Sequence, residues 1–131
     1  MSGELSNKRV AILVADGFEQ VELTSPREAL DRAGAMSDIV SPVKGEVQGM
    51  HHDKHGDKFQ VDVMLDKADA GMYDALLLPG GVMNPDTLRM NPAAVEFVRS
   101  FIDAGKPIAA ICQPRSAGGT DCLGLPLSAD R

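Results

Sequence analysis

The sequence predicts an α/β fold, a doubly wound α/β/α sandwich with a mostly parallel sheet. Short apolar runs that suit buried strands recur along the chain, at residues 8–15, 36–40, 73–79 and 108–111. Segments with the helical spacing of apolar residues separate the first run from the second and the third from the fourth. Because strands alternate with helices, we expect parallel pairing through right-handed crossovers.

The first half of the chain predicts a βαβ unit. The first strand ends at Asp16-Gly17, and the next strand is closed by Ser41-Pro42. Between them an apolar stripe with helical spacing runs through Val21, Leu23, Ala29, Leu30 and Ala33. Gly34 is a helix stop, and Pro26 lacks the amide proton that a helix interior needs. We therefore expect a short first turn, a kink or restart at Pro26, and a regular helix to about residue 33.

Residues 44–63 are polar and rich in Gly, His and Asp, which predicts a loop or small hairpin feeding an edge strand. Its histidines, His51, His52 and His55, have a spacing that suits no common metal site, so we interpret them as part of a solvated loop. A helical turn is expected over residues 66–70.

The second half predicts a strand, a helix and a last strand. The strand at residues 73–79 ends in Gly80-Gly81, and a helix begins at Asn91-Pro92. Gly105 ends this helix, whose apolar stripe comprises Ala94, Val95, Val98, Phe101 and Ile102. Residues 108–111 are apolar throughout, so we expect a strand covered on both faces that stops at Cys112.

The composition limits which classes of protein and partner are plausible. The chain has 131 residues, 44% of them hydrophobic and 24% charged, as in one soluble domain. A net charge of −6 gives no general attraction to nucleic acid or anionic lipid, and no apolar run is long enough to cross a bilayer. The polar start lacks the regions of a signal peptide, which predicts a cytoplasmic protein whose two cysteines are thiols.

Three features meet at the carboxyl edge of the predicted sheet, where such folds bind ligands. They are residues 16–22, the pair Gly80-Gly81, and Cys112. A cysteine, carboxylates and close-packed amides are the parts of an activated thiol site, with Cys112 on a nucleophile elbow. A lone cysteine after an apolar run is also often an inert core residue.

Three segments in order resemble the DJ-1/PfpI family of the flavodoxin-like, class I glutamine-amidotransferase-like superfamily. They are residues 14–26 (VADGFEQVELTSP), 73–81 (YDALLLPGG) and 105–112 (GKPIAAIC). Members are often described as intracellular proteases or protein deglycases. The resemblance covers about residues 8–112 of a single domain that spans residues 1–131.

The resemblance implies roles for particular residues. Cys112 would be the nucleophile, and Glu22 the carboxyl group that reaches its sulfur, with Glu19 the second choice. The implied oxyanion hole uses backbone amides of Gly81, Gly80 and Gln113. Such members need no metal or organic cofactor and commonly form dimers or hexamers.

The chain departs from the family after Cys112. Gln113 stands where the family usually has histidine, and glutamine cannot act as a general base near neutral pH. Residues 113–131 lack the helical stripe expected behind the elbow, so we expect the C-terminal part of the fold to be missing. A frameshift, premature stop or sequencing error would produce such a tail. A natural short variant is the alternative.

Two functions follow. One is a cysteine-dependent hydrolase, peptidase or deglycase/glyoxalase, whose thiolate attacks a small carbonyl substrate or a peptide, with activity impaired by Gln113 and the altered tail. The other is a non-catalytic thiol redox sensor or stress-response binding protein, in which Cys112 is oxidised rather than used for turnover. Family membership favours the enzyme, whereas Gln113 and the missing C-terminal part favour the non-catalytic function for this particular chain.

Overall fold

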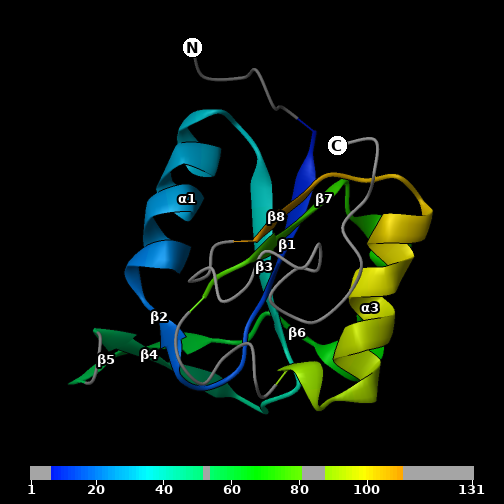
Figure 1. Cartoon of the computed structure of the whole chain (residues 1–131). Coiled ribbons are helices and arrows are strands. Elements are labelled where there is room, and N and C mark those ends of the chain that lie inside the picture. The colour runs from blue at the N-terminus through cyan, green and yellow to red at the C-terminus, as the bar shows by residue number, and fades with distance from the viewer. Residues whose placement is uncertain (1–6, 52–53, 81–87, 111–131) are drawn as a thin grey trace, which may run out of the picture.

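The computed structural model describes residues 7–51, 54–80 and 88–110 (Figure 1). Within them a five-stranded sheet, parallel at every pairing, has the order β6-β3-β1-β7-β8. Its strands in that order are β6 (Val63–Met64), β3 (Met36–Ser41), β1 (Arg9–Leu13), β7 (Ala75–Leu78) and β8 (Ile108–Ala110). In Figure 1, α1 (Val21–Arg32) and α3 (Pro92–Asp103) flank the sheet on opposite sides. The α/β fold with a mostly parallel sheet is confirmed.

The central strand β1 is buried on both faces of the sheet. Successive side chains of a strand point to opposite faces. Leu13 belongs to the core cluster that contains Phe101 of α3, whereas Ile12 belongs to the cluster that contains Leu23 of α1. All four side chains are inaccessible to solvent. A continuous apolar run, without polar alternation, is the pattern that this two-sided burial requires.

Both long helices end in a glycine-terminated Schellman motif. After α3, the Gly105 N–H donates to the Ile102 carbonyl at 3.0 Å, and the Lys106 N–H donates to the Phe101 carbonyl at 3.0 Å. Gly105 has a φ of 72°, and Gly34, which follows α1, has a φ of 91°. Glycine tolerates this left-handed backbone because it has no Cβ, so both predicted helix stops are confirmed.

The expected restart at Pro26 is wrong, because α1 runs without interruption from Val21 to Arg32 with Pro26 inside it. A proline at this position removes the hydrogen bond to the carbonyl of Glu22, in the first turn of the helix, and its ring crowds that carbonyl. Leu23, a residue of that same turn, is fully buried against the sheet and keeps the turn packed there. Packing therefore outweighs the loss of one hydrogen bond.

A second, smaller sheet lies below α1 in Figure 1, with the order β2-β4-β5. It consists of β2 (Phe18–Glu19), β4 (Glu46–His51) and β5 (Lys54–Gln60), the last two pairing as an antiparallel hairpin. The chain then enters β6 at the edge of the main sheet, so the predicted hairpin and edge strand are confirmed. Two 3-10 turns follow, η1 (Leu65–Lys67) and η2 (Ala70–Met72), where a single helical turn was expected.

The prediction that the last strand is covered on both faces is wrong for its described residues. Ala109 and Ala110 are exposed, and Ile108 is only half-buried. β8 is the terminal strand in the sheet order, and an apolar hollow of about 390 Å³ separates it from Pro26 and Leu30 of α1. The apolar run therefore predicts the strand correctly, but it does not predict whether other elements pack over both of its faces.

No helix in the described part of the chain combines the length and the apolar character that crossing a bilayer requires.

Candidate functional site at the carboxyl edge of the sheet

Glu22 and Gly80 form the centre of the candidate site. Glu22 lies in the first turn of α1, and its Oε1 accepts a hydrogen bond of 2.8 Å from the backbone N–H of Gly80. Gly80 follows Leu78, the last residue of β7, by two positions. Its carbonyl accepts a second hydrogen bond, of 2.8 Å, from the N–H of Glu19. The segment that leads into α1 is thus attached to both polar groups of Gly80.

The carboxyl group of Glu22 favours its protonated form more than a free glutamate does. Burial raises its pKa, because a partly desolvated carboxylate is less stable than the neutral acid. The Gly80 N–H lowers the pKa in part, and the negative charge of Glu19 raises it again. A carboxyl group that retains its proton more readily can donate a hydrogen bond to an anion.

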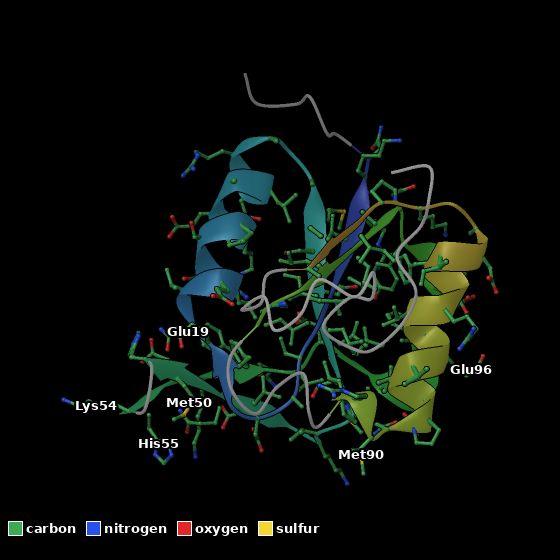
Figure 2. The ribbon with its side chains drawn as sticks, in the orientation of Figure 1. Glu19, Met50, Lys54, His55, Met90 and Glu96 are labelled. Atoms are coloured by element: carbon green, nitrogen blue, oxygen red, sulfur yellow. The ribbon has the colours of Figure 1, made fainter. Side chains whose placement is uncertain are left out.

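Glu19 lies at the junction with the smaller sheet. It pairs with Met50 of β4, close to the end of the hairpin where β4 finishes and β5 begins. His55, the register partner of Met50, and Lys54 lie at the same end of the hairpin, across the molecule from Glu96 of α3 (Figure 2). Glu19 therefore reaches the site through its backbone contact with Gly80 and through its charge.

The parallel pairing of β7 with β8 brings the expected nucleophile strand to the same edge. Leu78 is the register partner of Ala110, the last described residue of β8. Cys112, Gln113 and Gly81 lie outside the described residues, so their predicted roles are untested. Among the predicted site residues, the structure brings together Glu22, Glu19 and Gly80.

Asp16, also predicted at this edge, holds the hairpin. Its Oδ1 accepts a hydrogen bond of 2.8 Å from the Gln48 N–H. Gln20, which the sequence did not single out, is 8% exposed and bonded to Asp57 of β5. No local pattern marks this pair, because the two residues are 37 positions apart.

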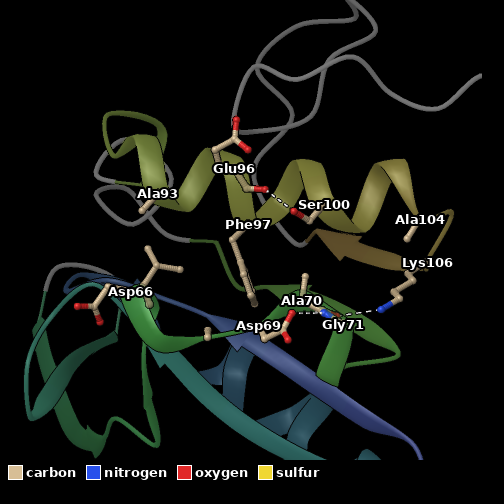
Figure 3. Close-up of a pocket in the computed structure, with 12 residues that line it drawn as sticks. Asp66, Asp69, Ala70, Gly71, Ala93, Glu96, Phe97, Ser100, Ala104 and Lys106 are labelled. Carbon is tan, nitrogen blue, oxygen red and sulfur yellow. Dashed lines mark hydrogen bonds between the residues drawn. The ribbon is translucent and has the colours of Figure 1, made fainter.

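A larger hollow, of about 510 Å³, lies on the α3 side (Figure 3). Phe97 and Ala93 of α3 line it opposite the small residues of the turns around Ala70. The amine of Lys106 donates to the carbonyls of Ala70 and Tyr73, at 2.9 and 2.7 Å. Glu22 does not line this hollow, which is a gap between α3 and the turns rather than part of the candidate site.

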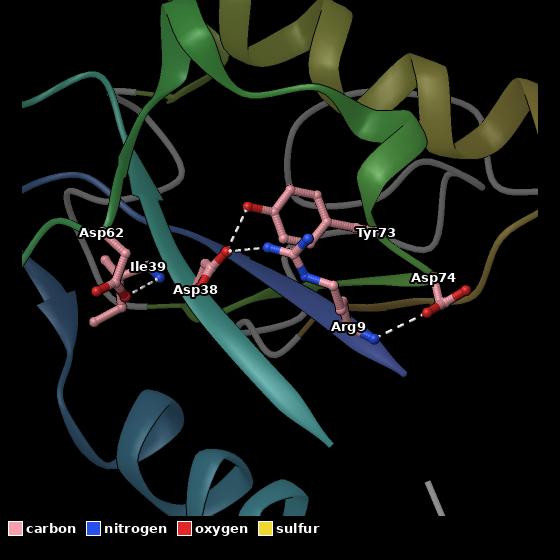
Figure 4. Close-up of polar contacts among 6 residues, drawn as sticks. All are labelled: Arg9, Asp38, Ile39, Asp62, Tyr73 and Asp74. Carbon is pink, nitrogen blue, oxygen red and sulfur yellow. Dashed lines mark hydrogen bonds and ion pairs between the residues drawn. The ribbon is translucent and has the colours of Figure 1, made fainter. Parts of the chain in front are cut away.

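A polar cluster joins the start of β1 to β3 and to Tyr73 (Figure 4). Asp38 Oδ2 accepts from the Tyr73 hydroxyl at 2.8 Å and from the Arg9 guanidinium at 3.0 Å. The Arg9 N–H donates to Asp74 at 2.9 Å. Burial, together with the bond to Asp38 and its negative charge, raises the pKa of Tyr73 well above its ordinary value. Every group has a partner within the cluster, which indicates a structural role.

Comparison with known proteins identifies relatives of the chain. YraA of Bacillus subtilis (strain 168), whose name describes a candidate cysteine protease, is 40% identical over 119 residues, covering 89% of this chain and 68% of that protein. Deglycase TK1284 of Thermococcus kodakarensis is 38% identical over 104 residues, covering 79% of this chain and 60% of the relative. The chain thus spans 60% to 68% of the length of these curated relatives.

Solved structures show the same fold. A crystal structure of a variant of the DJ-1 superfamily protein STM1931 from Salmonella typhimurium matches with a TM-score of 0.70 at 31% identity. The match covers 79% of this chain and 54% of that one. The family description that fits the sequence, over residues 8–117, is DJ-1/PfpI. The chain belongs to the DJ-1/PfpI family.

Proposed function

We propose that this chain carries the nucleophilic centre of a cysteine-dependent hydrolase of the DJ-1/PfpI type. Cys112 is the proposed nucleophile, and Glu22 the carboxyl group that acts on its sulfur. The proposed substrates contain a reactive carbonyl group: a peptide, an aldehyde such as methylglyoxal, or a glyoxal adduct on protein. The names of the relatives, which describe deglycases and a candidate cysteine protease, support this class.

The single observation that carries the proposal is the Glu22 carboxyl held at Gly80, beside the strand that leads to Cys112. Gly80 follows Leu78 by two residues, and Cys112 follows Ala110, the register partner of Leu78, by two residues. Continuing the parallel register would bring position 112 beside Gly80. A protonated carboxyl group there would donate to the sulfur and favour the thiolate.

The proposed chemistry begins with attack of the thiolate on the carbonyl carbon. The electron pair of the carbonyl moves to oxygen, and backbone N–H groups would stabilise the oxyanion that forms. We assign this role to the backbone N–H groups of Gly81 and Gln113. The oxyanion role predicted for Gly80 stays a prediction, and in this structure its N–H donates to the Glu22 carboxyl group instead. Gln113 cannot take up a proton, which leaves Glu22 and Glu19 as the titratable residues that are hydrogen-bonded to Gly80.

The two cysteines provide a matched test of the nucleophile. Cys112→Ala should abolish turnover of methylglyoxal, of methylglyoxal adducts of N-acetylarginine, and of fluorogenic peptides. Cys122→Ala, which removes the other thiol of the chain, should retain it. Circular dichroism should show the same fold for the parent and both variants. Turnover that survives in Cys112→Ala would refute the assignment.

The carboxyl partner has its own matched pair on α1. Glu22→Gln keeps an oxygen that can accept from Gly80 but removes the titratable proton. We expect it to raise the thiol pKa of Cys112 and to slow turnover by about 100-fold. Glu28→Gln, at an exposed position six residues along the same helix, should alter neither. A thiol titration unchanged by Glu22→Gln would remove Glu22 from the mechanism.

Gln113 favours a second candidate, a thiol redox sensor or stress-response binding protein. In that case the parent chain shows no turnover, and peroxide converts Cys112 to the sulfinic acid, a mass gain of about 32 Da. Cys122→Ala identifies which thiol is oxidised.

A cytoplasmic location and a dimeric or hexameric assembly stay predictions, to be checked by fractionation and by light scattering.

A further inference from the structure

Gln20 joins the start of α1 to the β4–β5 hairpin through both ends of its side-chain amide. Its Nε2 donates to Asp57 Oδ2 at 3.0 Å, and its Oε1 accepts from the backbone N–H of Asp57 at 2.8 Å. Gln20 is 8% exposed, so little water competes for these two hydrogen bonds. Together the two hydrogen bonds join the start of α1 to β5, two segments that are far apart in the sequence.

The backbone of Gln20 connects the same two parts. Its N–H donates to the Met50 carbonyl of β4 at 2.8 Å. Its carbonyl accepts from the N–H groups of Leu23 and Thr24, both at 3.0 Å, and so closes the first turn of α1. Gln20 occupies the N-cap position but makes no side-chain cap, because its side chain is committed to the hairpin. Glu22 lies in the turn that this backbone closes.

The hairpin is built to admit the Gln20 amide. A Cβ at Gly56 would lie only 2.1 Å from Gln20 Oε1, and a Cβ at Gly49 would lie 3.2 Å from it. The first distance is too short for any side chain, so glycine is required at position 56 while the amide holds its place. Two glycines on neighbouring strands, both facing one oxygen, indicate a contact on which the geometry of the hairpin depends.

We propose that Gln20 is a positioning residue, which fixes the first turn of α1 against the hairpin and thereby holds the Glu22 carboxyl at Gly80. The proposal rests on the function proposed above for its effect on turnover. Its structural part, the placement of Glu22, can be measured without any substrate. Gln20 itself does not touch the reacting atoms.

The test uses Gln20→Ala, with Gln60→Ala as the matched control, because Gln60 is an exposed glutamine of the same hairpin. Carbon-13 NMR of the glutamate carboxyl groups, assigned with Glu22→Gln, follows the titration of Glu22 directly. In Gln20→Ala we expect its midpoint to return toward 4.5, the ordinary value, and in Gln60→Ala to stay at the parent value. We also expect kcat to fall by about tenfold to 100-fold, with KM changed less than about threefold.

Asp57→Asn is a conservative control that keeps both hydrogen bonds to Gln20. Its amide oxygen still accepts from Gln20 Nε2 and its backbone N–H is unchanged, so Glu22 should titrate as in the parent. Asp57→Ala removes one of the two hydrogen bonds and should shift the Glu22 midpoint in the same direction as Gln20→Ala. If Gln20→Ala fails to fold, Asp57→Ala carries the test.

The outcomes separate the two proposals. A Glu22 midpoint equal to that of the parent in folded Gln20→Ala overturns the positioning role. A lower melting temperature with unchanged titration and unchanged kcat makes Gln20 a stability residue and overturns it equally. A shifted Glu22 midpoint in a chain whose parent shows no turnover supports the positioning of Glu22 and refutes the hydrolase.

Discussion

Replacing Tyr73 with phenylalanine removes one buried hydrogen bond and little else. Tyr73 is 3% exposed, and its hydroxyl donates to Asp38 at 2.8 Å. Phenylalanine retains the ring, and with it the edge contact with Phe97 and the position under the Arg9 guanidinium, whose centroid distances are 6.4 and 5.2 Å. The change therefore isolates the hydroxyl.

The expected loss is about 1–2 kcal/mol in the free energy of unfolding. A hydrogen bond to a charged group contributes roughly 1.5–3 kcal/mol, and leaving a buried acceptor without its donor costs a similar amount. Here the loss falls toward the lower end, because Asp38 keeps the Arg9 guanidinium at 3.0 Å and its side chain is 25% exposed to water. In a domain of this size the melting temperature should fall by about 3–8 °C.

Urea unfolding followed by circular dichroism measures this loss, with an unchanged m-value showing that the denatured state is the same. A double-mutant cycle with Asp38→Ala then isolates the pair. We expect a coupling free energy of about 1 kcal/mol, since Tyr73→Phe should cost little once the carboxylate is absent. A loss below about 0.3 kcal/mol, or strictly additive effects, would refute the reasoning.

Tyr73 is also the single tyrosine of a chain without tryptophan, so its ionisation can be followed by ultraviolet absorbance alone. The raised pKa means that the folded state favours the neutral phenol. Phenolate should therefore appear only well above pH 10, the ordinary midpoint, and a normal titration in the folded protein would contradict the Asp38 contact.

Three further predictions follow from single contacts. Asn91→Ala removes the side-chain oxygen that accepts from Ala93 and Ala94 at the start of α3, and should cost about 1 kcal/mol in urea unfolding; no loss would show that this cap is not needed. Phe101→Ala, at a fully buried site, should cost about 3–5 kcal/mol by the same measurement, and a loss under about 1 kcal/mol would contradict the packing of α3. Glu22→Gln should change the pH dependence of stability. Because the folded-state pKa of Glu22 is raised, the parent loses stability as pH rises above about 4.5, until the folded carboxyl has ionised. The stability of Glu22→Gln relative to the parent should therefore increase over that range, and a constant difference would contradict the raised pKa.

The elements of the fold were predictable where the cause is local. Gly34 and Gly105 end helices because the chain needs a left-handed residue there, and Asn91-Pro92 begins one because the asparagine oxygen caps the first turn. The prediction failed at Pro26, where the burial of Leu23 decides whether the helix continues. The spacing of apolar residues in the sequence does not show how deeply Leu23 is buried.

The candidate site divides in the same way. The sequence by itself determined the order of strands and helices, and hence that Glu22 and Gly80 reach one edge of a parallel sheet, since the carboxyl ends of parallel strands lie together. Only the tertiary structure decided that Glu22 accepts from the Gly80 amide, that Gln20 is bonded to Asp57, and that β8 has exposed alanines. The two contacts join residues 58 and 37 positions apart, and the exposure of β8 depends on what packs over it, so no local pattern of residues predicts them.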